Sequence, residues 1–157
     1  MRRALLLLAL AVIAACGRPQ QAAAPGGVAR RIASLSPAIS ATVVSLGWGD
    51  RLVGRTPWCA ELEAVPVVGS LLEVDLERLD AVHPDLVLVQ RTASGPPAGL
   101  AQAASRGGWR VVDVPCSSLA DVRDLEAAVQ RAVGESANPT RTAERWTAAL
   151  QPLAGAK

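Results

Sequence analysis

Four short polar stretches of this sequence carry side chains that could bind a ligand, and each follows an apolar run. They are Ser36-Pro37, Thr56 to Cys59, Gln90-Arg91 and Pro115 to Ser117. Trp58 offers a large flat ring that can bury much of its area against a flat ligand. Arg91 offers a planar guanidinium that pairs with carboxylates, amides or phosphates. These side chains predict a binding site rather than a reaction centre.

Hydroxyl groups add to this set, and each candidate also has a structural alternative. Ser36, Ser70 and Ser117 could present a hydroxyl or a backbone N–H at a helix start. Ser36 precedes Pro37, so we interpret it first as a helix cap. Trp58 could fold back onto a sheet edge, although we favour the ligand platform. For Arg91, ligand contact and a solvated loop charge both stay open.

Two thiols and one imidazole complete the residues with chemical potential. Cys59 and Cys116 could form a disulfide, remain free or pair between molecules, and their spacing alone does not decide. They would lie three strand spacings of about 4.8 Å apart in a sheet of order 2-1-3-4, whereas a disulfide needs Cα atoms within about 7 Å. His83, the only histidine, precedes Pro84 and fits a surface turn. We therefore predict no Ser-His-Asp triad, no metal site, no cofactor and no enzyme.

The elements that must position these residues alternate between strand and helix. Apolar runs predict strands at 30–36, 51–55, 85–90 and 109–114. Helices are expected from Pro37 to Gly47, at 75–82, at 97–106, after Ser118, and at 139–153. The helix after Ser118 should bury one face, formed by Leu119, Val122, Leu125, Val129 and Val133.

This alternation predicts an α/β fold: a parallel four-stranded Rossmann-like sheet flanked by helices and followed by a C-terminal helix. Ligands bind such sheets at the carboxyl ends of the strands. The four polar stretches all fall at that edge, and His83 falls at the opposite one.

The first 29 residues have a different character. Arg2 and Arg3 precede an apolar run to Ala15, which is shorter than the roughly 20 residues of a membrane-spanning helix. The run ends in Ile-Ala-Ala-Cys, which resembles a bacterial lipobox. We expect a lipoprotein signal peptide at 1–15, lipidation at Cys16 and a flexible tether at 16–29. The protein would then be a membrane-anchored lipoprotein of the periplasm or cell surface.

The charge of the mature chain is balanced. Of the 16 basic residues, Arg2 and Arg3 fall in the expected signal peptide. The other 14 equal the 14 acidic residues in number. There is no Lys/Arg cluster, and nucleic acid is therefore not an expected partner.

Two segments resemble a known family. They are "RIASLSPAISATVVSLGWGDRLVGRTPWC" and "PVVGSLLEVDLERLDAVHPDLVLV". Both are similar to the N-terminal lobe of class III periplasmic binding proteins, the cobalamin and iron-siderophore receptors of ABC importers. The likeness runs from Arg31 to about Val114 and continues more loosely beyond. It implies a non-catalytic solute receptor lobe at 30–157 whose partners are a small-molecule ligand and an ABC permease.

The resemblance also implies roles for single residues. Cobalamin-binding members carry an aromatic residue where Trp58 stands, which implies contact with the corrin ring. They often have tryptophan in a later loop, where this chain has Leu71, and the family often has an arginine at Arg91. Glu77 matches the acidic residue that engages arginines of the permease.

Family members have a second lobe, joined to the first by a long helix, which 139–153 would begin. This chain ends as that helix would finish. The leading hypothesis is a lipid-anchored receptor lobe for cobalamin or a ferric-siderophore or haem-like chelate. The second is a truncated or split member that no longer supports import and acts as an interaction module. The third is a two-cysteine redox protein, although the sequence has no Cys-x-x-Cys.

Overall fold

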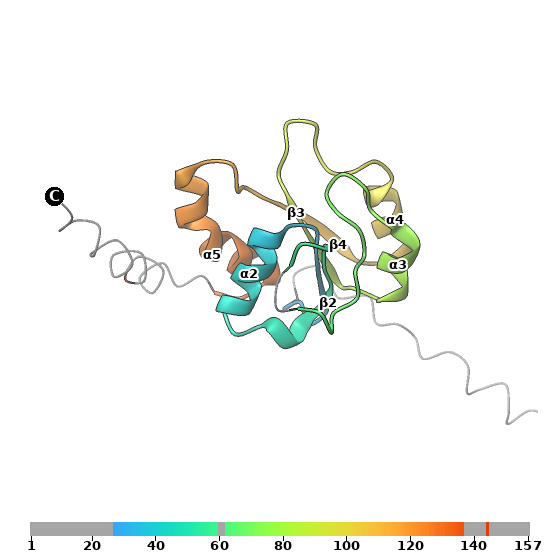
Figure 1. The fold of residues 1–157 in the computed structure, drawn as a ribbon, viewed down its shortest axis with the longest axis horizontal. Coiled ribbons are helices and arrows are strands. Elements are labelled where there is room, and N and C mark those ends of the chain that lie inside the picture. The colour runs from blue at the N-terminus through green and yellow to red at the C-terminus, as the bar shows by residue number, and fades with distance from the viewer. Residues whose placement is uncertain (1–26, 60–61, 137–143, 145–157) are drawn as a thin grey trace, which may run out of the picture.

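One parallel sheet organises the protein. The computed structural model describes residues 27–59, 62–136 and 144. Its strands are β1 (Ile32–Ser34), β2 (Leu52–Gly54), β3 (Leu86–Gln90) and β4 (Arg110–Val114). All pair in parallel in the order β2-β1-β3-β4, which confirms the predicted fold class (Figure 1).

The first two strands are shorter than the sequence predicts, with three residues each. Before β1, the backbone N–H groups of Arg30 and Arg31 donate to the side chain of Asp85 instead of joining a strand ladder. After β2, Arg55 makes only an isolated parallel bridge with Val67. The apolar pattern of these segments therefore reflects burial beyond the strand ends as well as pairing within the sheet.

Helices cover both faces of the sheet. They are α2 (Pro37–Ser45), the 3-10 turn η2 (Gly49–Arg51), α3 (Leu76–Ala81), α4 (Leu100–Gly107) and α5 (Leu119–Val133). Figure 1 shows α2 and α5 on one side of the strands and α3 and α4 on the other. The predicted helix at 139–153 lies outside the described residues, except for residue 144.

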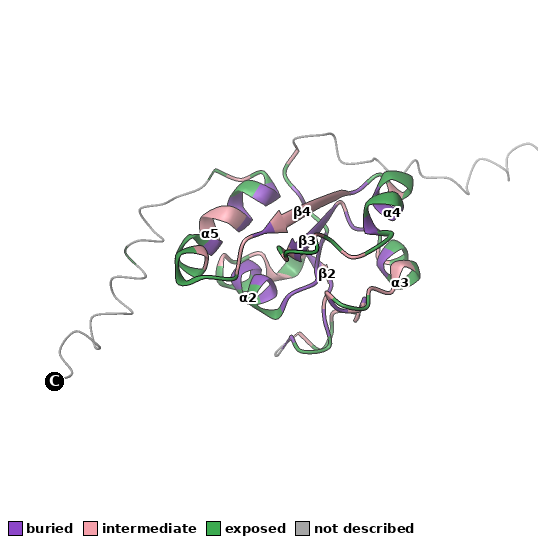
Figure 2. Cartoon of the chain, turned by 90° about the horizontal axis from the view of Figure 1, so that it is seen from above, coloured by how far each residue is buried: buried purple, intermediate pink, exposed green. Residues whose placement is uncertain are grey.

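Alternate residues of the strands fill two cores. On β3, Leu86 and Leu88 face the α2–α5 side, while Val87 and Val89 face the α3–α4 side. All four are fully buried, as expected for a central strand of a parallel sheet. Figure 2 shows buried residues along the strands and on the inner faces of the helices.

The buried face of α5 is only partly as predicted. Leu125, Val129 and Val133 are buried in the α2–α5 core, but Leu119 is 91% exposed and Val122 is also exposed. The first turn of α5 precedes the part of the helix that lies against the sheet, and its helical periodicity therefore has no partner surface. The expectation for Leu119 and Val122 was wrong.

Dense hydrogen bonding closes the amino end of the sheet. The Asp85 carboxylate accepts from the N–H groups of Arg30 and Arg31 at 2.9 and 3.2 Å. The Arg31 guanidinium donates to the carbonyls of Val82 and His83, which end α3. His83 is an exposed turn residue at this end, as predicted.

Two of the other tryptophans have structural roles. Trp109 is buried in the α3–α4 core. Trp48 is half-buried, and the Arg51 guanidinium carbon lies 5.0 Å from the centroid of its ring. Trp146 lies outside the described residues.

Candidate functional site

The loops that follow the four strands meet at the carboxyl edge, the upper side of the molecule in Figure 1. Hydrogen bonds connect the segments after β1, β3 and β4, and a shared groove connects Pro37 with Trp58. The edge therefore brings together most of the ligand positions predicted from the sequence. They are Ser36, Pro37, Trp58, Arg91 and Ser117.

Trp58 is exposed and forms one wall of a groove. Its relative exposure is 67%, so the ring does not fold back into either core. The groove has a volume of about 500 Å³ and runs between α2 and the loop after β2. Its lining residues are Pro37, Ser40, Ala41, Val44, Ser45, Trp58, Cys59 and Leu62. The surface available to a ligand here is mainly apolar and includes one flat aromatic ring.

Cys59 anchors the loop that presents Trp58. Its Sγ lies 3.2 Å from the Ser40 hydroxyl of α2 and 3.3 Å from Oγ1 of Thr56, and the residue is buried. Cys59 and Cys116 are both free thiols, so the disulfide that the sequence left open is not formed here. Cys59 thus holds its exposed neighbour in place from below.

Ser36 contributes to the edge in a way that its sequence position does not suggest. It occupies the N-cap position of α2, but its side chain makes no capping hydrogen bond. Its hydroxyl instead donates to Oε1 of Gln90 at 3.1 Å, and Nε2 of Gln90 donates to the Cys116 carbonyl at 3.5 Å. The capping interpretation of the Ser36 side chain was wrong because a partner on β3, 54 residues away, receives the hydroxyl.

The start of α5 forms the polar corner of the edge. Ser118 and Asp121 make a capping box, and Ser117 donates its N–H to Oδ2 of Asp121 at 3.0 Å. The hydrogen bond from Ser117 is the main cause that lowers the pKa of Asp121, and bonds from Ser118 and the charge of Arg91 act in the same direction. Arg91 is exposed, and its guanidinium donates to the Asp113 carbonyl at 3.5 Å.

The thiol of Cys116 is held neutral. Burial raises its pKa, and the negative charge of Asp121 raises it further. A reactive cysteine needs a lowered pKa and an accessible thiolate. Cys116 has a raised pKa, and Cys59 is buried. This arrangement does not favour the two-cysteine redox hypothesis.

Ser70 and Leu71 lie in the loop after Val68. Ser70 makes hydrogen bonds within this loop, and Leu71 packs against a core. The Ser70 hydroxyl accepts from the N–H groups of Leu72 and Glu73 at 3.3 and 3.2 Å. Leu71 is partly buried against the α3–α4 core. The next residue, Leu72, is 94% exposed, so Leu72 presents the apolar surface that the sequence placed at Leu71.

Two apolar residues of this edge were not ligand candidates in the sequence analysis. Leu72 and Leu119 are exposed large apolar residues in loops or turns that follow strands. Gln90, which the sequence analysis placed in one of the four polar stretches, lies between Ser36 and Cys116 and is half-buried. Its position as the polar last residue of an apolar central strand is the signal that marks it.

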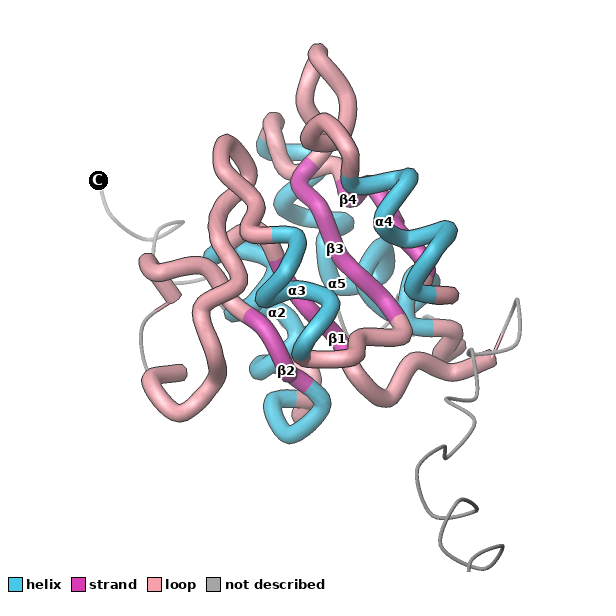
Figure 3. Tube along the Cα trace, turned by 90° about the vertical axis from the view of Figure 1, so that its right-hand side faces the viewer, coloured by secondary structure: helices cyan, strands magenta, loops and turns pink. Residues whose placement is uncertain are grey.

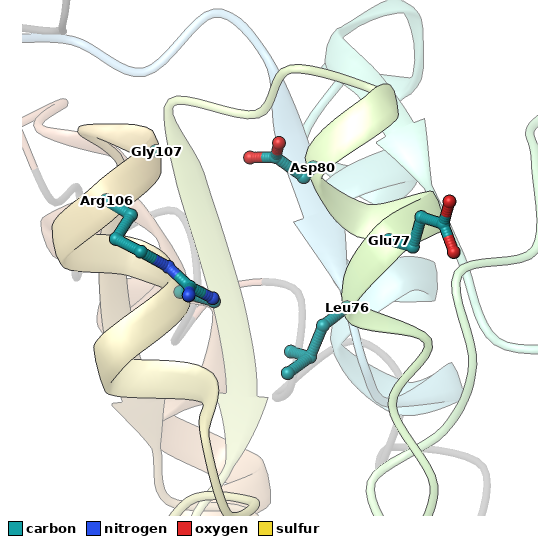
Figure 4. A pocket seen from close by; sticks show the side chains of 6 residues that line it. Leu76, Glu77, Asp80, Arg106 and Gly107 are labelled. Carbon is teal, nitrogen blue, oxygen red and sulfur yellow. The ribbon is translucent and has the colours of Figure 1, made fainter.

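Glu77 lies in the first turn of α3, on the face of the sheet that α3 and α4 cover. It borders a groove of about 470 Å³ between α3 and α4, lined by Leu76, Glu77, Asp80, Ala103, Arg106 and Gly107. Figure 4 shows Asp80 and Arg106 extending into the gap, whereas the Glu77 carboxylate points away from α4. Glu77 is exposed, and no ion pair of Glu77 is present among the described residues. The tube in Figure 3 presents this α3–α4 side toward the viewer.

Two further features of the described residues concern metal binding and membrane crossing. Within 27–59, 62–136 and 144, no three His, Cys, Asp or Glu side chains are grouped so that they could hold a metal ion. Among the helices of the same residues, none combines the length and the apolar character needed to cross a membrane.

Comparison with known proteins gives a clear structural likeness. No protein-family profile and no curated protein matches the sequence. Among solved structures, the periplasmic vitamin B12 binding protein of Vibrio cholerae matches with a TM-score of 0.61 and 23% identity, over 80% of this chain and 50% of that one. A periplasmic heme binding protein from Pseudomonas aeruginosa matches with a TM-score of 0.64 and 22% identity, over 78% and 44%.

A third structure, the periplasmic heme-binding protein BhuT with two hemes, matches with a TM-score of 0.66 and 22% identity, over 80% of this chain and 49% of that one. All three are described as binding proteins, and this chain spans about half the length of each. The chain therefore has the fold of one lobe of the class III periplasmic substrate-binding proteins.

Proposed function

We propose that this protein is a non-catalytic solute-binding component of an ABC importer, and that it binds cobalamin or a ferric-siderophore or haem-like chelate at the carboxyl edge. The observation that carries the proposal is the 67% exposure of Trp58 on the wall of a ligand-sized groove. A large exposed ring costs solvation free energy unless a ligand covers it. The structural neighbours bind ligands of this flat, macrocyclic kind.

The geometry supports a ligand that lies on the edge with one face toward the protein. Trp58 would stack on the ring, while Arg91 and Ser117 would meet polar groups at its periphery. Good ligand sites bury roughly 70 to 90% of the ligand surface. The described lobe covers one face only, while the entropy cost of holding the ligand is unchanged. We expect micromolar or weaker affinity, on the order of −8 kcal/mol at best.

Calorimetric titration of the purified protein with cyanocobalamin and haemin tests the platform. Trp58→Ala should weaken binding of the preferred ligand at least tenfold, because it removes the largest apolar contact. Trp58→Phe is the matched control: it keeps a flat ring and should retain most of the affinity. Melting temperatures should stay nearly unchanged because the ring is outside both cores. Equal titration curves for wild type and Trp58→Ala would exclude the platform.

Import would also need a permease, and Glu77 supports a docking contact. Its carboxylate is exposed and points away from α4, so it is free to meet a cationic side chain of a partner. Glu77→Ala should reduce co-purification with a permease and leave the melting temperature unchanged. A large loss of stability with undiminished co-purification would assign Glu77 a structural role.

The membrane anchor rests on the N-terminal sequence, which lies outside the described residues. A lipid on Cys16 followed by a tether at 16–29 would hold the lobe at 30–157 beside a permease. Cys16→Ala should shift the protein from the membrane fraction to the soluble fraction or block its processing. Unchanged partitioning and maturation would exclude the lipoprotein assignment.

A further inference from the structure

The amide of Gln90 is fixed at the centre of the carboxyl edge. Its Oε1 accepts from Ser36 Oγ at 3.1 Å, and its Nε2 donates to the Cys116 carbonyl at 3.5 Å. These partners follow β1 and β4, the two strands that flank β3. Because a carbonyl can only accept, the nitrogen of the amide must face the β4 side. Its orientation is therefore determined by the protein.

The Ser36 hydroxyl orients this amide at the expense of another role. Serine at an N-cap normally accepts from a backbone N–H of the first helical turn. Ser36 has the extended backbone of an N-cap, but its side chain makes no such bond. Pro37 follows at the first helical position. The hydroxyl donates to Gln90 instead of capping the helix.

Gln90 keeps hydrogen-bonding capacity that no partner among the described residues uses. A primary amide has two N–H donors and two acceptor lone pairs, and the two bonds above use one of each. The residue is half-buried, and its strand neighbour Arg91 and the nearby Ser117 are exposed. Oδ2 of Asp121 accepts from the N–H groups of Ser117 and Ser118. The second N–H of Gln90 and the guanidinium of Arg91 therefore offer donors at the centre of the edge.

We propose that Gln90 is a ligand-contacting residue of the proposed ligand site, a statement that rests on the proposed function. Its free N–H binds an oxygen acceptor at the periphery of the flat ligand, and Ser36 is the positioning residue that holds the amide in place. A corrin carries neutral amides at its periphery, whereas a haem carries carboxylates. A neutral amide at position 90 accepts both, but a carboxylate there would repel an acidic ligand.

The test compares three variants with two probe ligands, cyanocobalamin and haemin, by calorimetric titration. Gln90→Leu should weaken each ligand that wild type binds about threefold to tenfold, the effect of one lost hydrogen bond. Gln90→Glu should weaken haemin at least tenfold and change cyanocobalamin by less than about threefold, because amide N–H groups can donate to the new carboxylate. Ser36→Ala leaves the amide and the charge in place, and it should weaken binding about twofold to threefold.

Thermal unfolding is measured with each titration to show that the variants remain folded. Ser36→Ala tests the orientation of the amide without adding charge or bulk. Wild-type affinity in all three variants would overturn the role of Gln90 and leave the proposed function standing. An equal loss of both ligands in Gln90→Glu would show that a charge at position 90 does not meet the ligand periphery, and it would overturn the proposed contact. Wild type that binds neither probe would overturn the proposed function, and this inference with it.

Discussion

The two ends of the same sheet are built in opposite ways. At the amino end, Asp85 accepts two backbone N–H groups and Arg31 donates to the carbonyls that end α3. At the carboxyl end, Trp58, Leu72 and Leu119 are 67%, 94% and 91% exposed. At the amino end, polar side chains bond to the backbone of neighbouring segments. At the carboxyl end, large apolar side chains are exposed to solvent.

This difference separates stability from binding within one small domain. Hydrogen bonds between a carboxylate and backbone N–H groups are strong, and here they hold the segment before β1 against the segment before β3. Exposed rings and aliphatic side chains add little to folding but can bury area when a ligand arrives. Substitutions at the amino end should therefore change unfolding, and substitutions at the carboxyl end should change ligand affinity.

The largest effect is expected from Asp85→Ala at the amino end. It removes two charge-assisted hydrogen bonds to the start of β1, and the free energy of unfolding should fall by about 3 kcal/mol. Urea denaturation measures this loss. Ligand affinity at the opposite end should stay within about twofold of wild type.

Asp85→Asn is the matched control for that experiment. It keeps one acceptor oxygen and should lose roughly half as much stability. Unchanged stability of Asp85→Ala would contradict the stabilising role of the amino end. A folded Asp85→Ala protein that no longer binds the ligand would mean that the two ends are not separate in function.

A smaller effect is expected at the carboxyl end from Leu119→Ser or Leu72→Ser. Each side chain is almost fully exposed, so unfolding should change by less than about 0.5 kcal/mol. Affinity for the ligand should fall about threefold to fivefold in calorimetric titration, because apolar area that the ligand covers is lost.

Val28→Ser is the control from the other end of the sheet. Val28 is an exposed apolar residue beside the segment that leads into β1, so its substitution should leave affinity unchanged. Equal losses in Val28→Ser and Leu119→Ser would show that apolar exposure alone, and not its position at the edge, explains the effect.

The smallest effect is expected from Asp121→Asn and depends on pH. The pKa of Asp121 is lowered in the folded state, so its contribution to stability is complete above the ordinary aspartate pKa of about 3.9 and is lost as pH falls through the lowered folded value. Wild type should lose more stability than Asp121→Asn on acidification through this range, by thermal unfolding. Parallel curves for the two proteins would contradict the assignment.

The sequence predicted the fold where local pattern and tertiary burial agree. The apolar run of β3 predicts a central strand, and the residue types at Ser118 and Asp121 predict the capping box. Leu119 follows the same periodicity as Leu125, yet only Leu125 meets a core. Periodicity defines a helical face but does not show how far the opposing surface extends.

The site was less predictable because its contacts join distant residues. Ser36 has the sequence signature of a helix cap, but its hydroxyl donates to Gln90 on β3. In the loop after Val68, a shift of one residue exchanges the buried Leu71 for the exposed Leu72. Trp58 was predicted as exposed because strand order alone assigns its loop to the open edge.

The position of β1 in the sheet has a consequence for folding kinetics. β1 is the first strand in the chain but lies between β2 and β3, and its Ile32 pairs with Leu86. The nascent chain therefore cannot complete the pairing of β1 until β3 has been synthesised. Strands so far apart in the sequence must close a long loop, at a cost in chain entropy, before their hydrogen bonds can stabilise the chain. This requirement slows folding relative to local contacts. Until then, the apolar residues of β1 remain available to chaperones and to aggregation.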